Sequence, residues 1–259
     1  MHVSLLSSLT PGSPTADWVR TGLSRLGHDV DAVDRPDLPP AEAAAVGHRL
    51  ADSWQARTPD VVLALGWVAG LAATVAARET RVPVAVRLSR PGRGESGVVR
   101  VEAALARGAD LVLTPTPTDL EALVRIGAPR ARLHLVPDAV DVASYAAGSL
   151  DPGDPVTADS DDDLAVHALL VAMASGHAAV VTETGALPDL VVDGVTGVVV
   201  PQGGDLTLTA RALAADALRR DAMGLAAADR TAACYDTGVV SASLSRLLEE
   251  LPDRATAAA

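Results

Sequence analysis

Short runs rich in Val and Leu alternate with longer Ala-rich segments over residues 1–145. Apolar runs bounded by Gly, Pro or Asp are typical of buried parallel strands, and the longer segments between them are typical of covering helices. The pattern predicts strands at residues 3–6, 29–32, 61–65, 82–86, 111–114 and 133–136, and helices at 16–26, 41–55, 67–79, 99–107 and 118–126. This α/β order indicates a Rossmann-like parallel sheet with helices on both faces.

The pattern changes after Tyr145. Residues 146–157 are rich in Gly, Pro and Asp and are predicted to form a linker. Beyond them we expect a helix at 164–174, strands at 179–182 and 197–200, a helical turn near Leu187, and helices near 205–218, 221–233 and 239–251. Two strands do not make an independently stable sheet. The sequence therefore predicts one domain (1–145), a linker (146–157) and a partial second domain (158–259).

The composition argues against nucleic-acid binding, an internal disulfide and a membrane span. The formal net charge is −12, and six aspartates fall within residues 151–163, so we do not expect nucleic acid as a partner. The only cysteine is Cys234, which excludes an internal disulfide and favours a cytoplasmic location. Uncharged stretches at 61–77 and 164–182 are interrupted by Gly66 and Gly176, so we expect no membrane span.

Residues 172–201 carry the most specific motif, which reads Ala-Met-Ala-Ser-Gly-His-Ala-Ala-Val-Val-Thr-Glu-Thr-Gly-Ala-Leu-Pro-Asp-Leu-Val-Val-Asp-Gly-Val-Thr-Gly-Val-Val-Val-Pro. It resembles the second-domain signature of family 4 glycosyltransferases of GT-B fold. Residues 127–141, Gly-Ala-Pro-Arg-Ala-Arg-Leu-His-Leu-Val-Pro-Asp-Ala-Val-Asp, are similar to the end of that family's first domain. The resemblance covers both sides of residues 146–157, where the family carries the first half of its second domain. It implies a GT-B fold with a truncated second half.

The resemblance also implies a chemistry, namely retaining transfer of a sugar from a nucleotide diphosphate donor without a metal or other cofactor. An Arg and Lys pair stabilises the leaving diphosphate in that family. Both positions belong to the absent segment, and this chain contains no Lys. The family's Glu-x7-Glu pattern becomes Asp163 and Val171, so the ribose-binding carboxylate is replaced by an apolar side chain. We therefore assign no catalytic residue and expect weak nucleotide-sugar binding.

Two further segments are candidates for binding a substrate anion. Arg87, Arg90 and Arg93 follow the fourth predicted strand, and the alternative is a solvated Arg-rich loop. Glu183, Thr184 and Gly185 stand between a strand and a helical turn, and the alternative is an ordinary turn and cap. Asp163 completes the candidate substrate-binding set. His167 and His177 favour packing or capping roles. The aspartates at 159–163 lack the Gly and terminal Glu of a calcium loop, so no metal site is assigned.

Three functional hypotheses follow from these residues. The first is a glycosyltransferase relative with weak or absent transfer activity. The second is a non-catalytic binding module that partners an active glycosyltransferase. The third is an active transferase whose site is completed by another chain. A parallel sheet lacking its first strands presents an open edge, so we also expect a homodimer or a stable partner.

Overall fold

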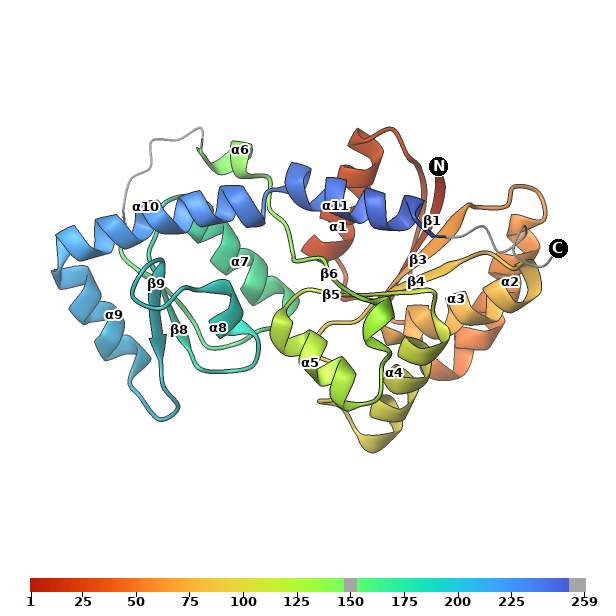
Figure 1. Cartoon of the computed structure of the whole chain (residues 1–259), viewed down its shortest axis with the longest axis horizontal. Coiled ribbons are helices and arrows are strands. Elements are labelled where there is room, and N and C mark those ends of the chain that lie inside the picture. Colours follow the sequence, from red (N-terminus) through yellow and green to blue (C-terminus); the bar gives the residue numbers. More distant parts are fainter. Residues whose placement is uncertain (147–152, 252–259) are drawn as a thin grey trace. The chain divides into compact units, whose positions relative to one another are not determined.

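The computed structural model describes residues 1–146 and 153–251. The chain divides into two compact units, with Met1–Val136 and Ser241–Ala259 in unit 1 and Pro137–Val240 in unit 2. Each unit is built on its own parallel sheet (Figure 1). Among the described residues, no helix combines the length and the apolar character that crossing a bilayer requires.

Unit 1 contains a six-stranded parallel sheet in the order β2-β1-β3-β4-β5-β6. Its strands are β1 (His2–Ser7), β2 (Asp29–Asp34), β3 (Val61–Leu65), β4 (Val84–Arg87), β5 (Leu111–Thr114) and β6 (Leu133–Leu135). β1, β3, β4 and β5 are buried along their whole length, as expected for central parallel strands that are covered on both faces. The strand order reverses between β1 and β3, and open α/β sheets bind ligands at the carboxyl ends of the strands beside such a point.

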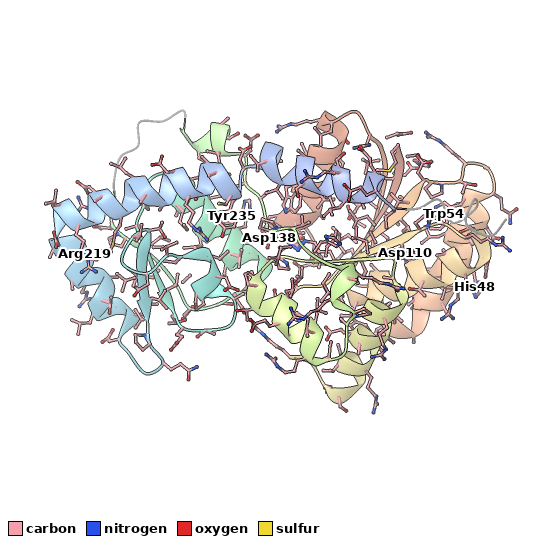
Figure 2. All side chains as sticks on the ribbon, viewed as in Figure 1. His48, Trp54, Asp110, Asp138, Arg219 and Tyr235 are labelled. Carbon is pink, nitrogen blue, oxygen red and sulfur yellow. The ribbon has the colours of Figure 1, made fainter. Side chains whose placement is uncertain are left out.

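Helices connect these strands, and most of the core of unit 1 lies beneath them. They are α1 (Pro14–Arg25), α2 (Ala43–Trp54), α3 (Trp67–Thr80), α4 (Ser96–Gly108) and α5 (Pro117–Arg125), with 3-10 turns η1 (Pro40–Glu42) and η2 (Arg130–Arg132). Trp54, labelled in Figure 2, joins Leu6, Val62 and Leu123 in one buried cluster. α2 lies very close to α3, because a Cβ atom at Gly47 would lie 2.6 Å from the carbonyl oxygen of Ala72.

A helix far along the chain completes unit 1. α11 (Thr237–Glu249) begins in unit 2, and its residues from Ser241 onward belong to unit 1. Nε2 of His28 lies 2.7 Å from Oγ of Ser245, and that hydroxyl donates to Oε1 of Glu249 at 2.9 Å. Leu244 and Leu248 are buried. The surface between α1 and β2 is thus linked to a helix that follows it by more than 200 residues.

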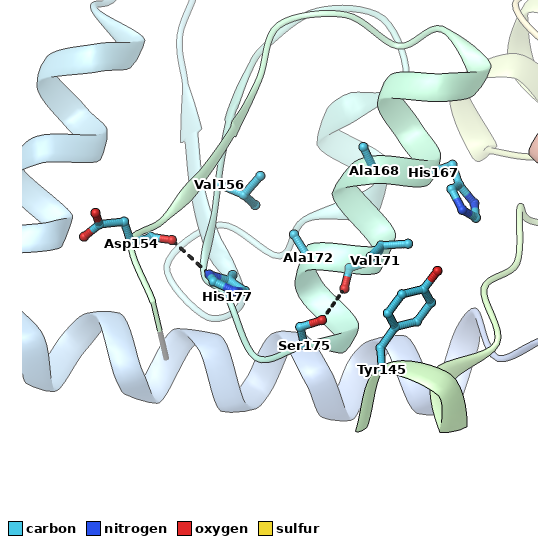
Figure 3. Close-up of a pocket in the computed structure, with 9 residues that line it drawn as sticks. All are labelled: Tyr145, Asp154, Val156, His167, Ala168, Val171, Ala172, Ser175 and His177. Atoms are coloured by element: carbon cyan, nitrogen blue, oxygen red, sulfur yellow. Dashed lines mark hydrogen bonds between the residues drawn. The ribbon is translucent and has the colours of Figure 1, made fainter. Parts of the chain in front are cut away.

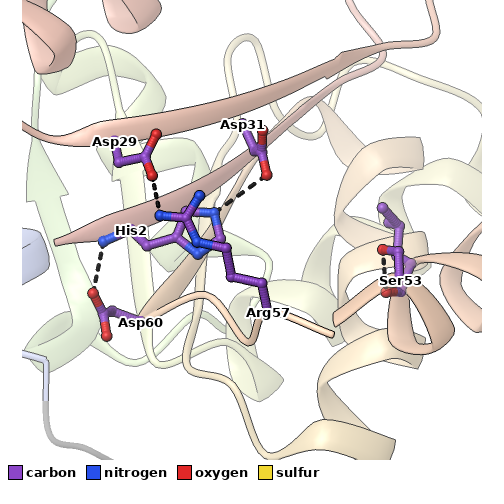
Figure 4. A network of polar contacts seen from close by, with 7 residues as sticks. His2, Asp29, Asp31, Ser53, Arg57 and Asp60 are labelled. Atoms are coloured by element: carbon purple, nitrogen blue, oxygen red, sulfur yellow. Dashed lines mark hydrogen bonds and ion pairs between the residues drawn. The ribbon is translucent and has the colours of Figure 1, made fainter. Parts of the chain in front are cut away.

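Polar contacts fasten the amino ends of the strands in unit 1 (Figure 4). The backbone N–H of His2 donates to Oδ2 of Asp60 at 2.6 Å, and Nε2 of His2 lies 3.3 Å from Oδ2 of Asp31. Arg57 forms an ion pair with Asp29. These contacts lie at the sheet edge opposite to the one that binds ligands in α/β folds, so we interpret them as structural.

Unit 2 contains a three-stranded parallel sheet in the order β7-β8-β9. The strands are β7 (Val156–Ala158), β8 (Ala179–Thr182) and β9 (Gly197–Val200). The helices are α6 (Val142–Ala146), α7 (Asp163–Ala174), α8 (Leu187–Leu190), α9 (Leu206–Ala215) and α10 (Ala217–Cys234). Leu170 and Met173 of α7 are buried together with Leu187 and Tyr235. The carboxylate of Asp193 accepts the N–H of Val199 at 2.9 Å on edge strand β9.

The second unit differs from the sequence prediction in its strands and in its limits. It has three strands, and the first two residues of β7 fall within the predicted linker; residues 147–152 of that linker lie outside the described part. The unit begins at Pro137, because Val140 pairs with the end of α10: its N–H donates to the carbonyl of Tyr235 at 2.9 Å, and its carbonyl accepts from Thr237 at 3.0 Å. Most of the last predicted helix belongs to unit 1.

Candidate functional site

The loop after β4 holds the three candidate arginines in different environments. Arg87 is 5% exposed, and its guanidinium carbon lies 6.0 Å from the centroid of the Trp18 ring. Arg90 and Arg93 are exposed on the loop. Arg90 adopts a left-handed conformation with φ of 52°. The structure therefore presents two of the three predicted cations to solvent and keeps Arg87 inside the unit.

Two buried carboxylates hold the backbone of this loop. Oδ1 of Asp119, in the first turn of α5, accepts the N–H of Arg90 at 3.1 Å. Oε2 of Glu102, on α4, accepts the N–H of Gly92 at 2.8 Å. Burial raises the pKa of Glu102, and the hydrogen bond from Gly92 opposes that shift. The sequence showed Glu102 among apolar helix residues but gave no sign that it positions the loop.

The loop after β1 borders a small hollow at the carboxyl end of the sheet. Ser13 caps α1 by accepting the N–H of Ala16 at 3.5 Å, and Pro14 occupies the first turn. The hollow has a volume of about 80 Å³ and extends to Asp34 at the end of β2. Ligand pockets usually span about 300–1,000 Å³. This hollow is too small for a nucleotide.

The acidic segment of unit 2 lies beside the loop after β8. Asp162 caps α7 by accepting the N–H of Ala165 at 2.9 Å, and Asp163 occupies the first helical turn. Oδ2 of Asp161 accepts the N–H of Ala186 at 3.0 Å. Both segments follow the carboxyl ends of neighbouring strands, which explains their proximity. The structure thus brings the region of Asp163 close to the 183–186 loop.

Glu183, Thr184 and Gly185 are exposed, but the loop uses most of its amides internally. The N–H of Glu183 donates to the carbonyl of Val200 at 2.8 Å, and that of Thr184 donates to the carbonyl of Thr182 at 2.7 Å. With Asp161 on Ala186, a carboxylate of the chain itself stands where the sequence suggested an external anion. This geometry favours the alternative reading, an ordinary turn and cap.

A larger pocket lies along one face of α7 (Figure 3). Its volume is about 630 Å³, within the range of ligand sites. We call it the α7 pocket, and it is lined by Tyr145, Asp154, Val156, His167, Ala168, Val171, Ala172, Ser175 and His177. Val171, which the resemblance aligns with the family's ribose-binding carboxylate, is among these residues. Asp163 is not.

The polar groups of the α7 pocket are few and are mostly engaged within the chain. Nδ1 of His177 lies 3.0 Å from the carbonyl oxygen of Asp154, and Oγ of Ser175 donates to the carbonyl of Val171 at 3.0 Å. Burial lowers the pKa of His167, and the carboxylates of Asp163 and Asp138 oppose that shift. The sequence favoured packing or capping for both histidines. The spacing of residues 167, 171 and 175, one helical turn apart, was the signal that they share a face.

The described residues contain no cluster of three His, Cys, Asp or Glu side chains that could hold a metal ion. Among the aspartates at 159–163, Asp162 caps α7 and Asp161 accepts the amide of Ala186.

Comparison with known proteins identifies the family. The sequence pattern of the glycosyl transferase 4-like domain matches residues 2–139, more than half of the chain. The chain belongs to this family. No curated protein matches the sequence significantly.

Solved structures of glycosyltransferases share the fold of this family member. Anabaena HepE in complex with UDP and glucose has 14% identity and a TM-score of 0.73, with 97% of this chain and 100% of that chain covered. Sucrose-phosphate synthase from Thermosynechococcus elongatus has 14% identity and a TM-score of 0.71, with coverages of 97% and 99%. A glycosyltransferase from Rickettsia africae has 9% identity and a TM-score of 0.70, with coverages of 96% and 98%. The fold is therefore the GT-B fold, with Rossmann-like parallel sheets.

Proposed function

We propose that this glycosyltransferase 4-like protein is catalytically impaired, binds nucleotide sugars weakly and transfers sugar slowly or not at all. The observation that carries the proposal is the lining of the α7 pocket. None of its nine lining residues is arginine, and Val171 stands where the resemblance places a carboxylate. HepE was crystallised with UDP and with UDP-glucose, so a nucleotide sugar is the natural class of ligand to test.

A departing nucleoside diphosphate gains negative charge, and without a metal that charge must be met by fixed cations. The described part of unit 2 contains four arginines, Arg211, Arg219, Arg220 and Arg230, all on α9 and α10. Arg220 pairs with Asp221 at 2.8 Å, and Arg230 donates to the carbonyls of Asp189 and Leu190. No arginine lines the α7 pocket. Diphosphate bound there would have no arginine guanidinium from the pocket walls, whose only basic groups are the imidazoles of His167 and His177.

The resulting loss of affinity can be bounded. A hydrogen bond to a charged group contributes roughly 1.5–3 kcal/mol, so losing the ribose contact and one phosphate contact weakens binding by about 10² or more. A donor that binds a complete site at micromolar concentration would then bind here at about millimolar concentration.

Nucleotide binding and turnover should be measured separately. Thermal shift with UDP, GDP, ADP and dTDP, free and as sugar conjugates, should give no saturable stabilisation at tens of micromolar, because a ligand at its dissociation constant contributes only about 0.4 kcal/mol. Release of nucleotide from each conjugate should stay at the rate without protein. A saturable shift at tens of micromolar, or protein-dependent release, would overturn the proposal.

If the protein does release nucleotide, the loop after β4 is the first candidate for a replacement diphosphate-binding site. Arg90→Ala and Arg93→Ala would then abolish release, whereas Arg125→Ala on α5 serves as an exposed control. A non-catalytic binding role is the second candidate function. The exposed apolar face of α10 favours it.

A further inference from the structure

The outward face of α10 carries apolar side chains in a regular row. Leu218 is 85% exposed and Leu225 is 52% exposed. Ala222, Asp229 and Ala232 are exposed as well, so the row has spacings of four, three, four and three residues. Single exposed leucines are ordinary, but this spacing places all five side chains on one seam of the helix. We call these five residues the α10 seam.

The α10 seam is not needed for the core of unit 2. The opposite face of α10 buries Met223, Ala227 and Thr231. Contact on that side is already very close, because a Cβ atom at Gly224 would lie 2.0 Å from the carbonyl oxygen of Gly176. The large apolar side chains of the seam therefore point away from a face that is already filled.

Two charged side chains, Asp229 in the α10 seam and Arg219 beside it, make no ion pair within the part of the chain that the structure describes. Arg219 donates its backbone N–H to the capping Asp216, but its side chain, labelled in Figure 2, makes no ion pair among the described residues. Asp229 likewise has no ion pair there. Arg220 and Arg230, by contrast, are engaged with groups of unit 2. The exposed face of α10 thus carries a cation at residue 219 and an anion at residue 229.

We propose that the α10 seam is a self-association surface on which a second copy of the chain docks its own α10 in antiparallel orientation. Arg219 and Asp229 lie five residues before and after residue 224. A two-fold axis at residue 224 would therefore bring each Arg219 level with the partner's Asp229, about 7.5 Å along the helix from the axis at 1.5 Å per residue. The two Asp229 carboxylates would be about 15 Å apart along the helices.

The same axis matches large side chains with small ones. Leu225 lies one residue from the axis and Ala222 lies two, so each Leu225 falls nearly level with the partner's Ala222. Each Leu218 falls near the partner's Ala232. Alternation of large and small residues lets two helices approach closely. Because one helix supplies both the cation and the anion at symmetric positions, the surface complements itself, which is the requirement of an isologous dimer.

Sedimentation equilibrium of the full chain from 1 to 100 µM tests this interface. We expect a dimer whose dissociation constant rises with salt, because the flanking ion pairs are exposed. Leu225→Glu should weaken the dimer about 100-fold or more, since a symmetric interface loses the leucine twice. Leu208→Glu, on exposed α9 outside the seam, is the matched control and should leave the dimer intact.

A charge swap separates pairing across the interface from damage to the fold. Arg219→Glu and Asp229→Arg should each weaken the dimer by about 10-fold, and the combined variant should recover most of the loss. Far-ultraviolet circular dichroism should be unchanged in all variants. A monomeric wild type at 100 µM, a dimer that survives Leu218→Glu with Leu225→Glu, or a charge swap without recovery would overturn the proposal. Survival of that dimer would favour an interface at the edge of the sheet instead.

Discussion

Val171→Glu offers a direct test of why the α7 pocket should bind nucleotides weakly. The side chain of Val171 is half-buried, lines the pocket, and lies one helical turn after His167. A glutamate here would restore a charged acceptor for ribose hydroxyls. Such a hydrogen bond contributes roughly 1.5–3 kcal/mol, which corresponds to about a 10- to 150-fold gain in affinity.

Opposing effects are smaller. Asp163 lies eight residues earlier on α7, about 12 Å along the helix axis, which exceeds the Debye length of about 8 Å in physiological salt. Val171 packs only partly against the core, so its loss should cost fold stability about 1 kcal/mol. We therefore expect the dissociation constant for nucleoside diphosphates to fall from about millimolar to between about 10 and 100 µM.

Isothermal titration calorimetry with UDP, GDP, ADP and dTDP measures this change. Ala168→Glu is the matched control, because it adds the same charge to the same pocket one turn away. A folded Val171→Glu variant that still fails to bind at millimolar concentration would refute the reasoning. Equal tightening by Ala168→Glu would refute it too, since the effect would then be one of charge and not of position.

Three other perturbations address the titratable and charged groups. Asp163→Asn should lower the pKa of His167 further, because the carboxylate opposes the effect of burial. NMR titration of the histidines measures this change, with Asp154→Asn as the control. The free energy of unfolding of the wild type should fall as the pH drops below about 6.5 towards the lowered pKa of folded His167. Glu102→Gln should flatten the pH dependence of the free energy of unfolding. Because the pKa of Glu102 is raised in the folded state, its contribution to stability is complete below the ordinary glutamate pKa of about 4.5 and is lost as the pH rises through the folded pKa. Urea unfolding from about pH 4 to 8 should show this loss in the wild type and not in the variant. Arg230→Met should lower the free energy of unfolding by about 2–4 kcal/mol, because its guanidinium donates to two carbonyls and to Tyr235 Oη; a loss below about 0.5 kcal/mol, as expected for Arg211→Met, would contradict this.

The sequence predicts best where one local pattern decides the structure. The strands at 61–65, 111–114, 179–182 and 197–200 have the predicted limits, because each is an uninterrupted apolar run between turn residues. β7 was missed, because three residues between Pro155 and Asp159 carry too little pattern. The GT-B fold followed from motifs spread over both halves of the chain, and the family match confirms it.

Contacts between distant residues were beyond the reach of local patterns. The sequence placed Asp163 and the 183–185 loop near the ends of strands but could not show that Asp161 accepts the amide of Ala186, 25 residues away. It grouped Arg87 with Arg90 and Arg93, because adjacency in sequence does not reveal that Arg87 is buried over Trp18. The α7 pocket required α6, α7 and the residues around β7 to be assembled first.

The position of α11 has a consequence for how the chain folds during synthesis. Unit 1 needs Ser241 and the residues after it, yet 104 residues, 137–240, are translated between Val136 and that helix. At about 5–20 residues per second, the ribosome leaves unit 1 without its last helix for roughly 5–20 s. During this interval His28 lacks Ser245, and the apolar surface that Leu244 and Leu248 later cover is open to water. All of unit 2 must therefore leave the ribosome before unit 1 can finish folding. The nascent chain exposes this aggregation-prone apolar surface on unit 1, the half that is synthesised first.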